Sequence, residues 1–308
     1  MKINDRPGSV ATIGFFDGVH LGHKCLIDQV ANEAKQRGLG TTLITFAEHP
    51  ARVLRPDTPL QLLTTPEEKA ELLGQTGIGH ISFLSFNREL ADMSARAFMD
   101  RILRQRLQVR ALVIGYDHRF GHNRSEGFED YQRYGREMGM EVIRAGELDR
   151  LPALAERSIS SSYIRECLTR GDIERANACL GYRYFIRGMV VGGFQVGRSI
   201  GYPTANILPT SPDKLIPRHG AYAVEVEMED GAIAYGMLNI GTRPTLGNGE
   251  NVTIEVNLFD FHADLYAELI EVRFVHFLRE EKKFPDVDSL KLQLQTDEQT
   301  CRALFSAT

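Results

Sequence analysis

Three features that often reveal a protein's class are scarce in this sequence of 308 residues: paired cysteines, an excess of basic residues and long apolar runs. The four cysteines form no C-x-x-C pair, which argues against a zinc site or a disulfide framework and favours reduced thiols in a cytoplasmic protein. Lysine and arginine number 36 against 41 acidic residues, so no overall basic field attracts nucleic acid. No run approaches the roughly 20 apolar residues of a membrane helix, and the first residues lack the apolar core of a signal peptide, so we expect no membrane partner.

The first half of the chain has the pattern of an α/β domain. Short apolar runs alternate with helix-length segments up to about residue 145. This order predicts a doubly wound parallel sheet, which binds ligands at the carboxyl ends of its strands. The predicted strands are Val10–Phe16, Thr41–Phe46, His80–Leu84, Ala111–Gly115 and Glu141–Ala145, and the predicted helices are Leu21–Arg37, Pro66–Gln75, Ala95–Leu107 and Glu126–Met138.

The second half has a different texture, with strand-like runs broken by glycine and proline after Gly181. Because few helices remain to cover an open sheet, this half predicts a small antiparallel β-barrel. A helical stretch from Ser162 to Leu180 joins the halves, so we predict two domains, residues 1–180 and 181–308. The predicted strands are Phe185–Val191, Ala221–Met228, Ile233–Ile240, Val252–Phe259 and Leu269–Val275, followed by a C-terminal helix over Val287–Phe305.

Residues 14–23, GFFDGVHLGH, lie between a predicted strand and a predicted helix. Free backbone N–H groups and the positive end of a helix dipole make such a junction a phosphate site. His20 and His23 add side-chain donors, and Gly22 leaves room between them for a polyphosphate. The alternative is an ordinary strand-to-helix turn in which the histidines only cap the helix.

Two further segments of the first half contain polar side chains that can hold a nucleotide. The segment GYDHRFGHNR follows the fourth strand, although His118 and His122, each taken singly, are better explained as solvated loop residues. The segment ISSSYIR, residues 159–165, places three serines at a helix N-terminus with Arg165 one turn in. Serines cap helices in any case, but beside the other segments they indicate a second phosphate clamp, with Arg165 gripping an anion through two nitrogens.

In the second half, GRSIGYPTAN at residues 197–206 places Thr204 and Asn206 on one face of an extended segment. Their oxygens suit a hard cation such as Mg²⁺ that bridges nucleotide phosphates, unless the segment only shapes barrel turns. Glu255 lies between two apolar neighbours, so strand alternation turns it to the opposite face from both. On an active-site face it is a partly desolvated general base, and on an outer face it is an ordinary solvated carboxylate.

The segments GFFDGVHLGH, TFAEHP, GYDHRFGHNR and SSSYIR, in this order and spacing, resemble the adenylyltransferase module of bacterial bifunctional riboflavin kinase/FMN adenylyltransferases, the FAD synthetases. The resemblance continues through GRSIGYPTAN, LNIGTRPT and TIEVNLFDF, which look like the riboflavin kinase module. It departs from the family at Ser162, where threonine is common, and at Asn257, where histidine is common. The implied fold is a doubly wound nucleotidyltransferase domain followed by a small β-barrel kinase domain with a C-terminal helix.

The resemblance implies that Mg²⁺ and ATP engage Thr204 and Asn206, and that Glu255 activates the substrate hydroxyl. The substrates and products are then riboflavin, FMN and FAD, and the predicted partners are small molecules. We predict catalytic roles for Glu255, His20, His23 and Arg165. The predicted ATP or phosphate ligands are Gly14, Phe16, Asp17, Gly22, Asp117, Ser160, Ser161, Ser162, Gly197, Arg198, Thr204 and Asn206, and the predicted flavin ligands are Asn239, Arg243, Arg279 and Phe284.

The aromatic residues that stack the flavin ring are not fixed by the motifs, with Phe16, Tyr116 and Phe120 as candidates in the first half. Asp17 more plausibly orients its loop or a ribose than takes part in chemistry. Two other functions stay open, namely a different H-x-G-H nucleotidyltransferase whose barrel binds the acceptor, and a flavin-binding or regulatory protein without turnover. The oligomeric state is not predicted.

Overall fold

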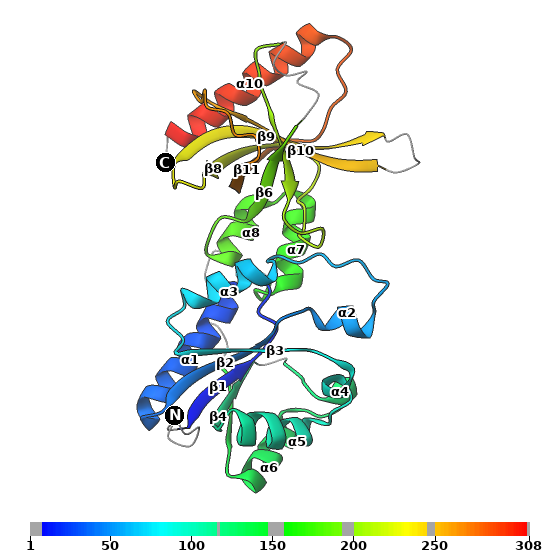
Figure 1. Cartoon of the computed structure of the whole chain (residues 1–308). Coiled ribbons are helices and arrows are strands. Elements are labelled where there is room, and N and C mark those ends of the chain that lie inside the picture. Colours follow the sequence, from blue (N-terminus) through cyan, green and yellow to red (C-terminus); the bar gives the residue numbers. More distant parts are fainter. Residues whose placement is uncertain (1–7, 116–117, 147–156, 193–199, 245–249, 307–308) are drawn as a thin grey trace. The chain divides into compact units, whose positions relative to one another are not determined.

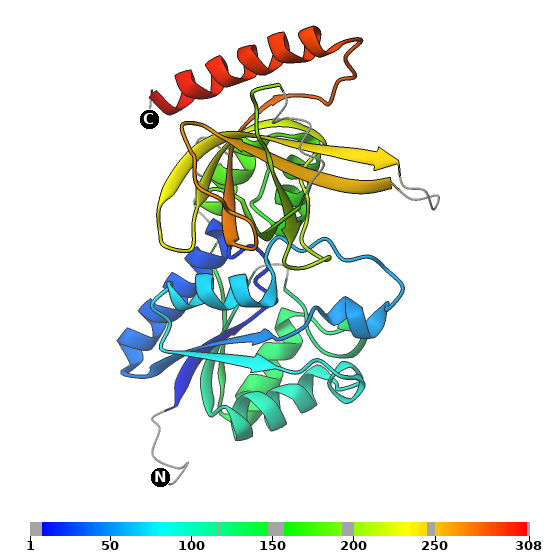
Figure 2. The same ribbon diagram turned by 45° about the horizontal axis from the view of Figure 1, so that its top comes forward.

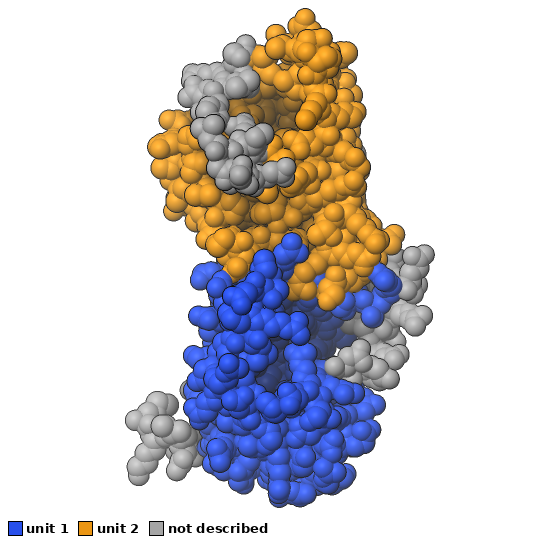
Figure 3. All heavy atoms as spheres, turned by 90° about the vertical axis from the view of Figure 1, so that its right-hand side faces the viewer, with its two compact units in different colours: residues 1–161 blue, residues 162–308 orange. Residues whose placement is uncertain are grey.

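The computed structural model forms two compact units, residues 1–161 and 162–308, which are described separately (Figure 3). It describes residues 8–115, 118–146, 157–192, 200–244 and 250–306. For residues 243, 244, 250 and 251 it describes the backbone only.

A five-stranded parallel sheet forms the centre of the first unit (Figure 1), which confirms the predicted fold. The strand order is β3-β2-β1-β4-β5, so the order reverses between β1 and β4. In sheets of this kind, ligands bind outside the carboxyl ends of the strands at that switch point. The strands are β1 (Ser9–Ile13), β2 (Gly40–Phe46), β3 (His80–Leu84), β4 (Val109–Ile114) and β5 (Glu141–Arg144).

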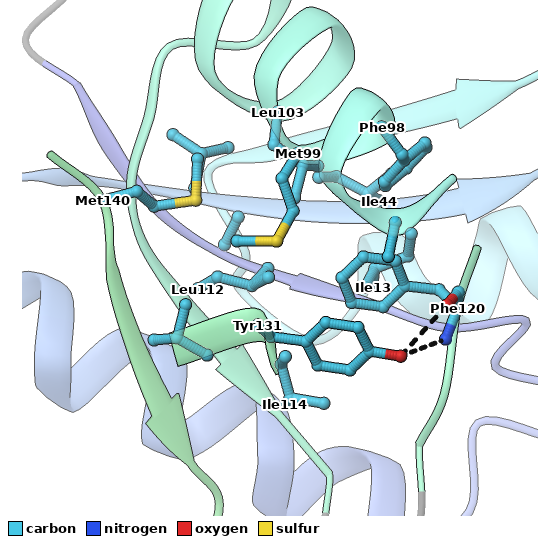
Figure 4. Close-up of a cluster of buried hydrophobic side chains, with 14 of the residues drawn as sticks. Ile13, Ile44, Phe98, Met99, Leu103, Leu112, Ile114, Phe120, Tyr131 and Met140 are labelled. Carbon is cyan, nitrogen blue, oxygen red and sulfur yellow. Dashed lines mark hydrogen bonds between the residues drawn. The ribbon is translucent and has the colours of Figure 1, made fainter. Parts of the chain in front are cut away.

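Helices cover both faces of this sheet because alternate strand residues point to opposite sides. On one face, Leu112 and Ile114 pack with Met99, Leu103 and Tyr131 (Figure 4). On the other face, Val10, Ala111 and Val113 pack with α1. The helices are α1 (Leu21–Arg37), α2 (Pro50–Leu54), α3 (Pro66–Gly74), α4 (Arg88–Ala91), α5 (Ala95–Phe98) with its π-helical continuation Met99–Arg106, and α6 (Phe128–Met138); α2, α4 and the 3₁₀ turn His122–Arg124 were not predicted.

The second unit is a closed antiparallel barrel in the strand order β10-β7-β6-β11-β8-β9, which confirms the predicted barrel and adds the strand β7. Helix α10 lies along one side of the barrel (Figure 2), where Cys301 packs against Ala223 and Met237. All four cysteines lie in the described residues, and none of them forms a disulfide there. The elements are α7 (Ser161–Arg170), α8 (Ile173–Leu180), β6 (Phe185–Val191), β7 (Ala205–Pro209), β8 (Gly220–Glu227), β9 (Ile233–Pro244), β10 (Glu250–Leu258), β11 (Leu269–Arg279) and α10 (Val287–Ser306).

Candidate functional sites

The histidine pair lies where β1 gives way to α1. His20 caps α1, since its Nδ1 accepts a hydrogen bond from the backbone N–H of His23 at 3.3 Å. The two imidazole rings stack with their centroids 3.6 Å apart. A Cβ at Gly22 would meet the His20 ring at 3.1 Å, so a larger residue at position 22 would crowd this ring. His20 thus caps the helix and also forms a stacked pair with His23 at the switch point.

One ring nitrogen of His23 makes no hydrogen bond to the described residues. Its Nδ1 is buried and has no hydrogen-bond partner among the described residues. The pKa of His23 is held well below its ordinary value, chiefly by burial and then by electrostatic interaction with His20, His118 and Lys69. His23 is therefore a neutral imidazole near pH 7, able to hydrogen-bond a ligand without carrying charge.

Asp17 holds the loop after β1 in place. Its two carboxylate oxygens accept hydrogen bonds from the backbone N–H groups of Leu63 and Thr64, at 3.1 and 3.0 Å, and from the Thr64 hydroxyl at 3.1 Å. The Ser161 hydroxyl donates to the Asp17 carbonyl oxygen at 2.8 Å. This arrangement fits the loop-orienting role of Asp17, with Ser161 as a second anchor of the same loop.

Two aromatic candidates of the first unit are buried. Phe16 is 2% exposed and meets the His23 ring edge-on, and Phe120 is 8% exposed and stacks on Tyr131. Burial removes both rings from the candidates for stacking a flavin and gives Phe16 a packing role beneath His23. Gly14 lies against the Phe16 ring, since a Cβ at position 14 would meet this ring at 3.1 Å.

Two groups of predicted site residues are not placed together: those divided between the two units, and those outside the described residues. Ser160 belongs to the first unit, whereas Ser162 and Arg165 lie on α7 in the second unit. Asp117, Gly197, Arg198, the candidate ring of Tyr116 and the side chain of Arg243 lie outside the described residues.

The barrel aligns its predicted residues in a single row across the strands. Glu255 of β10 stands directly opposite Asn206 of β7 on one side and Asn239 of β9 on the other. The row continues through Ala221 of β8 to Arg279 of β11. Directly opposed residues of an antiparallel sheet share a face, so polar side chains from strands far apart in the sequence line one surface.

Glu255 is half-buried on this surface, opposite to its apolar neighbours Ile254 and Val256, which are 4% and 1% exposed. The Thr204 hydroxyl donates to its Oε2 at 3.4 Å. Strand alternation therefore places Glu255 as predicted, and the carboxylate is neither fully solvated nor isolated.

Asn257 holds the segment that carries Thr204. This residue, which replaces the histidine common in the resembled family, is 7% exposed, and its Nδ2 donates to the Pro203 carbonyl oxygen at 2.7 Å. An amide thus supplies the hydrogen bond that keeps Thr204 beside Glu255.

The oxygens of Thr204, Asn206 and Glu255 are of the kind that Mg²⁺ prefers. Across the described part of the chain, no three His, Cys, Asp or Glu residues form a cluster that could hold a metal ion. A cation at this row would therefore be bound by hydroxyl, amide, carboxylate and phosphate oxygens together, which the donor set permits.

Arg279 is engaged in an ion pair. Its Nε and Nη2 donate to the Asp297 carboxylate of α10 at 2.8–3.2 Å, with the two side chains 14% and 6% exposed. The guanidinium also lies 5.8 Å from the centre of the Phe284 ring. Arg279 therefore joins β11 to α10, and this structural role accompanies the flavin contact predicted for it.

Two residues that were not predicted as ligands lie beside the histidine pair. Lys69 of α3 is 1% exposed, and its Nζ donates to the Phe46 carbonyl oxygen at 2.8 Å. His118 follows β4 and has a buried Nε2. The signal for His118 was its place directly after a strand end, whereas Lys69 has the appearance of an ordinary helix residue in the sequence.

The first domain is doubly wound and has a stacked imidazole pair at its switch point. The second is a closed barrel with a carboxylate among oxygen donors. Together they define a two-domain nucleotide-binding protein. Two family models match the chain, FAD synthetase over residues 2–163 and riboflavin kinase over residues 180–305. A bifunctional riboflavin kinase/FMN adenylyltransferase of Listeria monocytogenes is 38% identical, covering 96% of this chain and 92% of its own. One of Bacillus subtilis is 36% identical, covering 98% and 94%. The chain belongs to the family of bifunctional riboflavin kinase/FMN adenylyltransferases.

The whole two-part fold recurs in a crystal structure named a macrolide-efflux protein from Streptococcus pneumoniae, with a TM-score of 0.87 and 32% identity over 98% of this chain and 96% of that one. That name describes that protein. In the present chain, none of the described helices has the length and apolar character needed to cross a membrane.

Proposed function

We propose that this chain uses ATP twice, first to phosphorylate riboflavin to FMN in the barrel and then to adenylylate FMN to FAD at the parallel sheet, with release of pyrophosphate. The order of the two family domains along nearly the whole chain supports this function most directly. We assign the adenylyltransferase domain to residues 1–180 and the kinase domain to 181–308. Helices α7 and α8 fall almost entirely between the two family matches.

The kinase step needs a base, because the terminal hydroxyl of the ribityl chain is a poor nucleophile near pH 7. Glu255 takes the hydroxyl proton while the oxygen attacks the γ-phosphorus of ATP. Its half-buried position, its hydrogen bond from Thr204 and its place opposite Asn206 support this role. Thr204 and Asn206 hold Mg²⁺, which when bound neutralises charge on the phosphates.

The adenylylation step needs no base, because the phosphate of FMN is already ionised when it attacks the α-phosphorus of the second ATP. The obstacle is repulsion between two anions, so the site needs hydrogen-bond donors and positive charge. Within the first unit, His20, His23 and Ser161 supply hydrogen-bond donors, and on the sequence motif alone we assign Ser162 and Arg165 to the same phosphates. The buried, unpartnered Nδ1 of His23 supports a direct contact with a phosphoryl oxygen.

The test is chromatography of riboflavin incubated with ATP and Mg²⁺, with a parallel reaction that starts from FMN. We expect FMN and FAD from riboflavin, FAD from FMN, and no product when a chelator removes Mg²⁺. FAD from FMN without FMN from riboflavin would favour the other H-x-G-H nucleotidyltransferase, in which the barrel only binds the acceptor. Absence of both products with retained flavin binding would favour the regulatory protein.

A further inference from the structure

His118 lies at the same switch point as the histidine pair. Strands β1 and β4 are neighbours in the sheet, with Thr12 opposite Val113, so the loops that follow these strands leave the same edge. His20 and His23 follow β1, and His118 follows β4, where its backbone N–H donates to the Gly115 carbonyl oxygen at 3.1 Å. Electrostatic interaction with His118 is among the causes that lower the pKa of His23.

Two ring nitrogens at this edge lack a partner. Both Nδ1 of His23 and Nε2 of His118 are buried without a hydrogen bond to any described residue. Buried polar atoms in folded proteins are almost always paired, because an unpaired one destabilises the fold. Two such atoms in interacting imidazoles, from strands that flank the switch point, therefore indicate a place for a ligand that accepts or donates hydrogen bonds.

The charges around these imidazoles favour an anionic ligand. Arg124 lies close enough to lower the pKa of His118, and Lys69 does the same to His23. The acidic group of this edge, Asp17, has both its oxygens engaged by residues 63 and 64. Burial is the main cause that lowers the pKa of His118 to about 4, so His118 meets its ligand as a neutral ring.

Tyr131 anchors the chain shortly after His118. The Tyr131 hydroxyl lies 3.0 Å from both the N–H and the carbonyl oxygen of Phe120, and the two rings stack with centroids 4.2 Å apart (Figure 4). Phe120 lies two residues after His118, so the chain is anchored close to this histidine.

We propose that His118 is a third imidazole of the adenylyl-transfer site and that its Nε2–H donates to a phosphoryl oxygen of ATP beside His23. This inference rests on the proposed function. It adds a residue to the nucleotide contacts and leaves the chemical step unchanged.

The test replaces His118 by Phe, which keeps a flat ring and removes both nitrogens, and follows FAD formation from FMN and ATP. We expect kcat/KM for ATP in adenylylation to fall by at least about tenfold, since one donor to the reacting phosphates is lost. Riboflavin phosphorylation should not change. The thermal midpoint should stay equal or rise, because a buried unpaired nitrogen has been removed.

Two matched variants sharpen the result. His118→Gln retains an N–H donor at a similar reach and should recover part of the lost adenylylation. His122→Phe changes an exposed histidine of the same loop, whose Nδ1 lies 3.3 Å from the Ala91 carbonyl oxygen, and should leave both activities at the parent level. Parent-like adenylylation in His118→Phe overturns the proposal. So does a loss of activity that comes with a lower thermal midpoint and is not recovered by Gln, because that pattern describes a packing residue.

His23→Ala separates this inference from the function on which it rests. If His23→Ala abolishes adenylylation and His118→Phe does not, only the role of His118 is wrong. If neither variant affects adenylylation, the location of the adenylyltransferase site is wrong.

Discussion

Burial sets the charge of the titratable groups around His23. The imidazoles of His23 and His118 are neutral near pH 7 because desolvation lowers their pKa values. Neutral donors suit a site that binds polyphosphate and then releases pyrophosphate, because they stabilise the anion without the strong attraction of a full charge pair. Lys69, a buried cation, differs from these neutral imidazoles because it carries its charge against the Phe15 ring, 3.9 Å from the ring centre.

Lys69 predicts a pH-dependent stability. Burial lowers its pKa from 10.5 to about 8, opposed by the charge of Asp17. The unfolded chain therefore keeps the lysine proton between about pH 8 and 10.5 whereas the folded chain has released it, so raising the pH through this range stabilises the fold. Relative to Lys69→Met, the parent should gain up to about 3 kcal/mol in free energy of unfolding across this range.

Urea unfolding of both proteins at several pH values, followed by circular dichroism, measures this difference. A difference that stays constant from pH 7.5 to 10.5 would show that the Lys69 amine titrates like a solvated one. Lys69→Arg is the matched control, because its guanidinium does not titrate in this range.

The positions of His20, His23 and Glu255 could be predicted from the sequence. The two histidines follow a strand end, and strand alternation puts Glu255 on the face opposite its apolar neighbours. The sequence could not predict the burial of Lys69. A lysine within the first turn after the capping residue Thr65 is usually a surface residue, and only the tertiary packing places it against Phe15 and the last residue of β2, Phe46. For the same reason, the sequence could not predict that the Phe16 ring is buried against His23.

Beside its apolar packing, α10 is attached to the barrel by a buried ion pair. Arg279 at the end of β11 donates from two nitrogens to Asp297, which also accepts from the Gln293 amide at 2.8 Å. Asp297→Asn removes the charge and leaves a buried guanidinium without its counterion, which should destabilise the second unit by about 3–5 kcal/mol.

The control is Asp260→Asn, which breaks an exposed ion pair between Asp260 and Arg302, a residue of α10. This change should lower the free energy of unfolding by less than about 1 kcal/mol. Chemical unfolding of both variants gives the comparison. Equal effects would mean that burial of the Arg279–Asp297 pair does not matter for the attachment of α10.

Long periodic elements were predicted well, and short ones were not. The predicted range of α1 is the observed one, and all five parallel strands occur near their expected positions. Helices α2 and α4, of five and four residues, are too short to show a period. Strand β7 ends on Pro209 and presents Leu208 to solvent, so it lacks the alternation of a half-buried strand, although the barrel closes through its pairing with β6 and β10.

The chain as a whole combines two chemically different transfers. An oxygen nucleophile that must lose a proton is assigned to the domain with the half-buried carboxylate Glu255. A nucleophile that is already an anion is assigned to the domain with neutral imidazoles. The two-domain order was predictable because motifs of both modules run through the sequence. The cross-strand row around Glu255 was not, because the register of strands distant in sequence depends on barrel closure.

Paired activity measurements on His23→Ala and Glu255→Ala test this division of labour most directly. FMN formation from riboflavin and FAD formation from FMN are followed separately in each purified variant. We predict that His23→Ala loses most FAD formation and keeps FMN formation near the parent rate, and that Glu255→Ala loses about 100-fold or more in FMN formation and keeps FAD formation. Equal loss of both activities in either variant, or riboflavin phosphorylation at the parent rate in Glu255→Ala, would contradict it.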